Sequence, residues 1–214
     1  MGNQKQKIAN FYIDGFNIYY NAVKNTSYKW LDFSKMVSLL FPSFYIHNIK
    51  YFTARVKSLP RDPHQQNRQQ IFLRALGTIP NLEIIYGHFA THSVFLPLKN
   101  PPSQSNGMVE VLKTQEKGSD VNLATHLLRD GFFNLYDVAI VISNDSDLVE
   151  AIKIVKSELL KEVIIAYPNK NSVNNALKQV ASHVMPIRDS VLAVSQFPPI
   201  MQDAHGQFTK PPTW

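Results

Sequence analysis

Short apolar runs alternate with amphipathic segments along most of this chain. The run at 138–142, "VAIVI", is rich in β-branched residues and bounded by polar turn residues, which predicts a strand buried on both faces. Alternating strands and helices predict an α/β fold with a mostly parallel sheet covered on both faces. The other strands are expected at 8–13, 46–54, 82–89, 163–166 and 183–186, and the helices at 16–23, 33–41 (with Asp32 as N-cap), 64–76, 121–130, 146–160 and 172–181.

Two parts of the chain depart from this alternation. Strand-like runs at 91–98 and 108–113 flank the loop "KNPPSQSNG", which predicts a β-hairpin inserted at about 91–114. Residues 191–214 are rich in proline with little periodicity, so they are expected to form a tail or docking segment outside the core of a domain at 1–190. Packing of Phe197, Phe208 and Trp214 on the domain or on a neighbour stays open. The hairpin and the tail are both candidates for homodimerisation or for selecting a substrate.

Composition narrows the class of protein. The 214 residues suffice for one large domain, and 44% apolar with 18% charged residues is ordinary for a globular protein. No apolar run approaches the ~20 residues of a membrane span, and no signal-peptide pattern is present, so no membrane partner is expected. The lack of cysteine excludes disulfides and thiolate sites and favours a cytoplasmic protein. A net charge of +6 weakly favours a polyanionic partner.

Acidic residues follow predicted strands or begin a predicted helix. Asp14 ends the first strand, Asp145 and Asp147 follow the strand at 138–142, and Asp120 precedes an apolar helix. Ligands of open parallel sheets bind at the C-terminal strand edge, so these acids are expected to meet there if the two strands are neighbours. Clustered carboxylates repel one another, and Mg²⁺ or Mn²⁺ would join them and activate water. Phosphodiester hydrolysis is the reaction that such a site indicates.

Each acid also has a structural interpretation. Asp120, Asp145 or Asp147 would serve as a helix cap, and Asp14 before Gly15 would shape a turn. Capping uses one acid per helix start, so it leaves one of the paired acids and Asp14 unexplained. Spacing alone leaves a metal site and a set of caps both open.

Three blocks of sequence resemble those of a known family. The blocks "DGFNIYY", "EKGSDVNLATHLL" and "YDVAIVISNDSDLVEAIKIV" are similar to the signatures of NYN domains, the LabA-like branch of the PIN-like nuclease superfamily. The resemblance runs from the first strand to about Asp189. It implies a three-layer α/β/α fold with an acidic pocket, and a metal-dependent endoribonuclease that uses Mg²⁺ or Mn²⁺ to cleave RNA and leaves 5′-phosphates.

The resemblance also implies roles for individual residues. Asp14, Asp120 and Asp145 match metal-binding acids, and Asp147 matches a ligand of a second ion or an outer acid. Asn17 matches a catalytic amide that orients a phosphate or a water, although without the family a turn-stabilising role is favoured. Many relatives carry glycine where this chain has Asn144, a residue that tolerates left-handed backbone geometry.

Residues around these blocks are candidates for binding RNA that is single-stranded or has unpaired segments. Hydrogen bonds to the acids or to phosphate are expected from Ser143, Ser146 and Lys117, with Glu116 as a lesser member of the acidic ring. Arg55 and Arg68 are expected to bind the phosphates that flank the cleaved bond. Stacking on unpaired bases is open to Tyr19, Tyr20 and Phe52, although packing in the fold is the favoured explanation of each.

Two other functions stay open from sequence alone. A non-catalytic RNA-binding or regulatory protein would retain the same acidic pocket. A metal-dependent phosphatase has less support, because Asp14 lacks the second acid two residues later that haloacid-dehalogenase-like phosphatases carry. No H-E-x-x-H zinc motif or glycine-rich nucleotide loop is present, and His126 is interpreted as structural.

Overall fold

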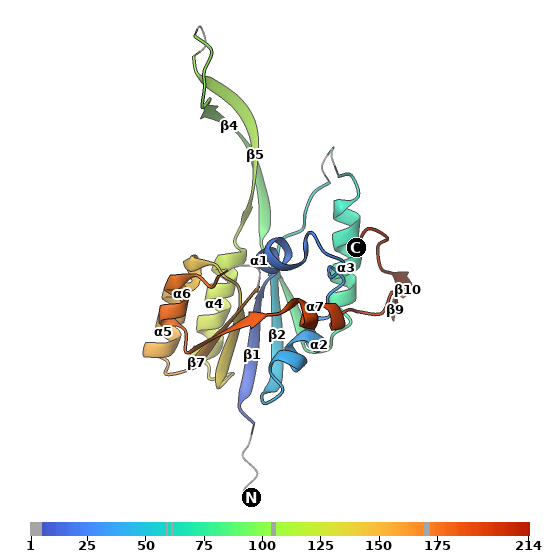
Figure 1. Cartoon of the computed structure of the whole chain (residues 1–214), viewed down its shortest axis with the longest axis vertical. Coiled ribbons are helices and arrows are strands. Elements are labelled where there is room, and N and C mark those ends of the chain that lie inside the picture. Colours follow the sequence, from blue (N-terminus) through green and yellow to red (C-terminus); the bar gives the residue numbers. More distant parts are fainter. Residues whose placement is uncertain (1–5, 59, 61, 104–105, 169–171) are drawn as a thin grey trace, which may run out of the picture.

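The computed structural model describes residues 6–58, 60, 62–103, 106–168 and 172–214; residues 104 and 105 of the predicted hairpin loop lie outside the described residues. A six-stranded parallel sheet forms the centre of the fold (Figure 1). Its strands are β1 (Ile8–Asp14), β2 (Tyr45–Thr53), β3 (Leu82–Tyr86), β6 (Val138–Ile142), β7 (Glu162–Pro168) and β8 (His183–Ile187). Their spatial order is β3-β2-β1-β6-β7-β8, so the order reverses between β1 and β6.

Helices cover both faces of this sheet, which gives the predicted three-layer α/β/α fold (Figure 1). Asp32 caps α2 as predicted, because its side chain accepts the Lys35 N–H. Within the described part of the chain, no helix has both the length and the apolar character needed to cross a membrane. One face carries α2 (Phe33–Leu40), α3 (Gln65–Leu76) and α7 (Asp189–Val194), and the other carries α4 (Ser119–Phe132), α5 (Val149–Ser157) and α6 (Asn175–Val180).

The strand β6 is buried on both faces, as its composition predicts. Ile140 and Ile142 pack in the core beneath α2 and α3, whereas Ala139 and Val141 pack beneath α4 and α5. Burial of one such large aliphatic side chain contributes roughly 1.5–3 kcal/mol. Because Ile142 lies opposite Ile13 in the β1–β6 pairing, both strands end at the same level of the sheet edge.

Two of the predicted helices contain an irregular turn. The segment expected as a helix at 16–23 is α1 (Gly15–Ile18) followed by a π-helical turn, Tyr19–Val23. The segment at 146–160 begins as a 3₁₀ turn, Ser146–Leu148, before α5. Each of the two segments starts after an aspartate whose side chain accepts a backbone N–H: Asp14 caps α1, and Asp145 caps the 3₁₀ turn.

Residues after 190, which the sequence sets apart from the core, contribute to it. Phe197 and Phe208 are buried in the main core cluster. The Trp30 indole N–H donates to the Pro198 carbonyl at 2.8 Å, because a buried tryptophan needs an acceptor. The segment also forms a small hairpin of β9 (Ile200–Asp203) and β10 (Gly206–Thr209). Low periodicity therefore reflects irregular packing here and does not separate these residues from the core.

A long β-hairpin of β4 (His88–Pro97) and β5 (Met108–Lys117) projects away from the domain (Figure 1). The two strands form ten residue pairs. They extend closer to the domain than the predicted strands at 91–98 and 108–113. The end of the hairpin that joins the domain is closely packed. A Cβ atom at Gly87 would lie 2.5 Å from a Glu116 carboxylate oxygen, which is too close for any residue larger than glycine without a shift. Gly118 adopts a φ of +93°, a left-handed conformation that favours glycine, and turns the chain from β5 into α4. The hairpin base is thereby placed at the C-terminal edge of the sheet.

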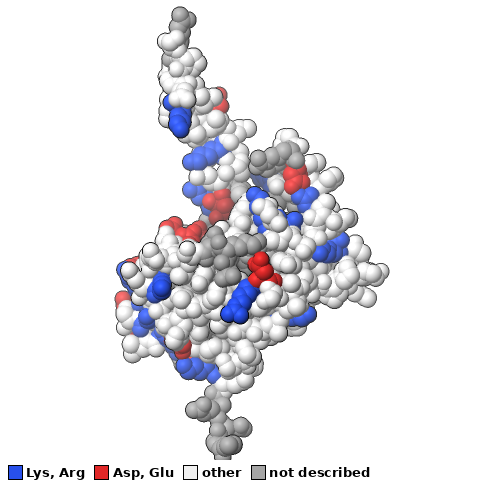
Figure 2. Space-filling view, in the orientation of Figure 1, with Lys and Arg blue, Asp and Glu red and all other residues white. Residues whose placement is uncertain are grey.

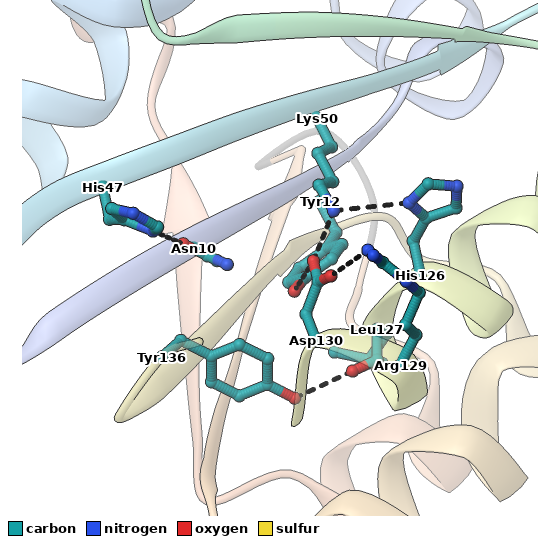
Figure 3. Close-up of polar contacts among 9 residues, drawn as sticks. All are labelled: Asn10, Tyr12, His47, Lys50, His126, Leu127, Arg129, Asp130 and Tyr136. Atoms are coloured by element: carbon teal, nitrogen blue, oxygen red, sulfur yellow. Dashed lines mark hydrogen bonds and ion pairs between the residues drawn. The ribbon is translucent and has the colours of Figure 1, made fainter. Parts of the chain in front are cut away.

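A buried ionic network lies between the sheet and α4 (Figure 3). The fully buried Asp130 accepts from Lys50 Nζ at 2.5 Å, from the Tyr12 hydroxyl at 2.9 Å and from Arg129 Nη1 at 3.2 Å. His126 Nδ1 lies 3.3 Å from Lys50 Nζ, so this histidine lies beside the buried network. Burial and the Lys50 charge lower the pKa of His126.

Candidate acidic metal site

Three carboxylates meet at the C-terminal edge of the sheet, beside the reversal of strand order. Asp14 ends β1, Asp145 follows β6, and Asp120 lies in the first turn of α4. One oxygen from each carboxylate lies within 4.8 Å of one from each of the other two. The adjacency of β1 and β6, which the sequence could only assume, is confirmed by their parallel pairing.

Asp14 is held firmly in this group. Its carboxylate is buried, and accepts the Asn17 backbone N–H and the Ser143 hydroxyl, each at 2.9 Å. Burial raises the pKa of Asp14, and the nearby Asp145 charge adds to the effect, while the hydrogen bonds oppose it. Asp14 therefore caps α1 and faces its acidic neighbours with the same side chain, so the two interpretations of this residue are compatible.

Asp120 and Asp145 differ in their local roles. Gly118, and not Asp120, occupies the N-cap position of α4. Burial, followed by the charges of Asp14 and Asp145, raises the pKa of Asp120 to about 6. Asp145 does act as a cap, because its Oδ1 accepts the Asp147 N–H at 2.9 Å. Capping thus accounts for Asp145 in part and does not account for Asp120.

No ion pair between described residues supplies a positive partner to the acidic group. Among the ion pairs of the described residues, none includes Asp14, Asp120 or Asp145. By contrast, the fully buried Asp130 is neutralised by Lys50 and Arg129. A cluster of carboxylates without cationic side chains fits a hard divalent cation with oxygen ligands.

A cavity of about 330 Å³ opens beside these carboxylates and is called here the acidic cavity. Phe89 reaches it from the base of the hairpin, where it lies opposite Glu116 in the β4–β5 pairing. The sequence analysis missed Phe89 because only the hairpin pairing brings it to the site. The lining consists of Asp14, Phe16, Asn17, Tyr20, Asn21, Phe89, Glu116, Ser119, Asp120 and Asp145.

Asn17 and Asn144 join the loops around the cavity. The Asn17 side-chain oxygen accepts the Asn144 N–H at 3.2 Å. The Asn144 side chain accepts the Asn174 N–H at 2.7 Å and donates to the Ser172 carbonyl at 3.0 Å. Asn144 does not adopt a positive φ, so left-handed backbone geometry is not needed at this position. Compared with a glycine, Asn144 adds the side-chain hydrogen bonds to the neighbouring loop.

The predicted polar residues occupy different surroundings. Ser143 is buried and its hydroxyl is bonded to Asp14 and to the Asp145 N–H, so it supports the carboxylates. Glu116 lines the acidic cavity and accepts the Ser119 N–H at 3.1 Å. The remaining three, Ser146, Asp147 and Lys117, are exposed and do not line the acidic cavity.

The residues predicted to contact phosphates and bases also differ in their surroundings. Arg68 forms an ion pair with Asp62 at 2.5 Å, and the Arg55 guanidinium lies 4.9 Å from the centre of the exposed Tyr86 ring. Phe52 was a candidate for stacking on bases, but it has no exposed surface and packs in the core against Tyr12. Figure 2 shows that, on the face in view, Lys and Arg side chains are spread over the domain and the hairpin and do not form one patch.

Comparison with protein families matches residues 9–188 to the NYN domain. The chain belongs to the NYN domain family. NYN is a PIN-like nuclease family, and nucleases of this type use divalent metals, which agrees with the group of three aspartates in this NYN domain.

Two individual proteins resemble this NYN domain. The 6-hydroxy-3-succinoylpyridine 3-monooxygenase HspA of Pseudomonas putida is 25% identical over 231 residues, which cover 95% of this chain and 74% of the relative. The crystal structure of a protein of unknown function from Vibrio parahaemolyticus superposes with a TM-score of 0.53 at 18% identity, covering 88% of this chain and 97% of the other. The second likeness establishes a shared fold.

Adding Mn²⁺ to this NYN domain is expected to raise its melting temperature by about 5–10 °C at 100 times the dissociation constant. The reason is that the three converging carboxylates exist as a group only in the folded chain. The melting temperature is measured by circular dichroism with Mn²⁺ and with EDTA. Asp120→Asn is expected to lose the shift, whereas the exposed Asp189→Asn keeps it; equal shifts in the two variants would place metal binding elsewhere.

Proposed function

We propose that this NYN domain is a divalent-metal-dependent endoribonuclease that hydrolyses RNA phosphodiester bonds. The observation that carries the proposal is the meeting of Asp14, Asp120 and Asp145 beside an open cavity, with no cationic partner among the described ion pairs. Membership of a PIN-like nuclease family supports it.

The three aspartates would hold Mg²⁺ or Mn²⁺. When bound, such an ion offsets phosphoryl charge and activates water for in-line attack. The Asn17 N–H and the Ser143 hydroxyl fix the orientation of Asp14 toward the cavity. Glu116 and Asp147 contribute negative charge from the margin, since both raise the pKa of Asp120. We therefore assign Asp147 as an outer acid.

The cavity walls favour RNA with unpaired segments. Phe16, Tyr20 and Phe89 line the cavity beside the carboxylates, and bases stack on aromatic rings with little regard to sequence. The Asn17 side chain would orient the scissile phosphate or the attacking water, while Lys117, Arg55 and Ser146 would contact flanking phosphates. We also propose that residues 1–190 carry the catalytic residues and that the hairpin contacts RNA or a second copy. The cytoplasm is the compartment that we propose for the protein.

The proposal is tested with labelled single-stranded, hairpin and transfer RNAs in Mn²⁺, Mg²⁺ or EDTA. Metal-dependent cleavage that leaves 5′-phosphates is expected. RNA binding without cleavage in any metal would favour the non-catalytic, RNA-binding alternative. Metal-dependent hydrolysis of small phosphomonoesters with RNA left intact would favour the phosphatase.

The similarity to a monooxygenase favours a second candidate, oxidation of a small heteroaromatic acid. The named relative acts on 6-hydroxy-3-succinoylpyridine, and the similarity covers 95% of this chain. Oxygen uptake is measured with that compound and reduced nicotinamide or flavin as electron donor. We expect no uptake above the donor-only control; coupled substrate turnover would replace the nuclease with this candidate.

A further inference from the structure

A second cavity, of about 420 Å³, lies next to the acidic one and is called here the aromatic cavity. The two share Phe16 and Tyr20, whose rings are stacked with centres 6.4 Å apart. A ligand in the aromatic cavity would therefore sit one side-chain wall away from the three aspartates. The acidic site as described makes no use of this space.

Rings form much of the surface of the aromatic cavity. Phe33, Tyr51 and Phe72 are buried core residues that also line it. Tyr20 has an exposed fraction of 58%, and Trp214 is half-buried in the same lining. The volume lies within the roughly 300–1,000 Å³ of small-ligand pockets. Its volume and its aromatic lining suit a planar, partly polar ring.

The aromatic cavity is also positively charged. Lys24, Lys29 and Arg68 line it, against one acid, Asp62, which is already paired with Arg68 at 2.5 Å. Among the ion pairs of the described residues, neither lysine has a carboxylate partner. Lys24 Nζ lies 4.8 Å from the centre of the Tyr20 ring, so a cation and a ring face are already adjacent. The lining thus offers cations for an anionic group beside a place for a ring.

We propose that the aromatic cavity binds one unpaired nucleotide of the RNA, its base against the Tyr20 and Trp214 rings and its phosphate at Lys24 and Lys29. This inference rests on the proposed function and specifies its substrate: an RNA cut next to a nucleotide that is free of base pairing. Because every base has a ring face, such a subsite selects unpaired structure more than sequence.

The test uses the full chain without metal. Binding of uridine and adenosine 5′-monophosphates is measured by calorimetry and compared with ribose 5-phosphate, which lacks the base, and pyridine-3-carboxylate, a small heteroaromatic acid. Removing the base is expected to weaken binding about fivefold to 100-fold. Trp214→Ala and the Lys24→Ala, Lys29→Ala double variant are each expected to weaken nucleotide binding tenfold or more, whereas the exposed Lys35→Ala on α2 leaves it unchanged. Circular dichroism checks that each variant is folded.

The outcomes separate this inference from the nuclease proposal. Nucleotide binding that depends on the cavity residues supports the subsite, even if RNA is not cleaved, in which case the nuclease proposal alone fails. RNA cleavage without nucleotide binding, or nucleotide binding that folded cavity variants retain, overturns the subsite alone. Tighter cavity-dependent binding of pyridine-3-carboxylate than of either nucleotide would also overturn it and assign the cavity to a small heteroaromatic acid.

Discussion

Asp14→Asn is expected to lower the rate of RNA cleavage by about 100-fold or more, because it weakens the hold on the ion that the reaction needs. The amide is nearly the same shape, and its oxygen still accepts the Asn17 N–H, so the folded structure is expected to remain. What changes is the charge: a neutral amide is a poor ligand for Mg²⁺ or Mn²⁺. Single-turnover cleavage of one labelled RNA, at saturating enzyme, measures the effect.

Two other aspartates provide the comparison. Asp147→Asn is expected to have a smaller effect, since Asp147 is exposed and does not belong to the group of three carboxylates. Asp189→Asn, on the exposed start of α7, is expected to leave the rate unchanged. Cleavage by folded Asp14→Asn at the rate of the unaltered protein would remove the acidic site from the mechanism.

Lys50→Met is expected to lower the free energy of unfolding by about 3–5 kcal/mol, the usual cost of removing one partner from a buried ion pair. The side chains of Lys50 and Asp130 are 5% and 0% exposed, and their atoms lie 2.5 Å apart. Without Lys50, the side-chain partners that the carboxylate keeps among the described residues are the Tyr12 hydroxyl and Arg129, whose side chain is 57% exposed. Urea unfolding at neutral pH measures the loss.

Matched substitutions identify the cause of that loss. The exposed pair of Lys153 and Glu150 is the control, and Lys153→Met is expected to change the free energy of unfolding by no more than ~0.5 kcal/mol. Adding Asp130→Leu to Lys50→Met is expected to restore part of the stability, because no unpaired charge is then buried. A Lys50→Met protein as stable as Lys153→Met would contradict the buried-charge explanation.

The sequence predicts the acidic site better than its surroundings. Asp14 and Asp145 follow strands whose apolar composition is visible locally, and parallel strands expose their C-terminal ends at one edge, so their meeting could be anticipated. The sequence could not place Phe89 at the site, because Phe89 reaches the acidic cavity through its pairing with Glu116 across the hairpin. Glu116 lies 27 residues after Phe89 in the chain (116 − 89 = 27). Phe52 is the opposite case: the sequence leaves it open as a contact to bases near the site, but the fold buries it in the core.

Local patterns in the chain are enough for the strands, most helices and the three-layer arrangement, because periodicity reports which side chains face the core over a few residues. They are also enough to mark Asp14 and Asp145 by their positions after strands and Asp120 by its position before an apolar helix. Three features require the folded chain: the packing of Phe197 and Phe208 into the core, the pairing of Lys50 with Asp130, and the aromatic cavity. Each joins residues distant in sequence, and such contacts depend on long-range packing that no short pattern records.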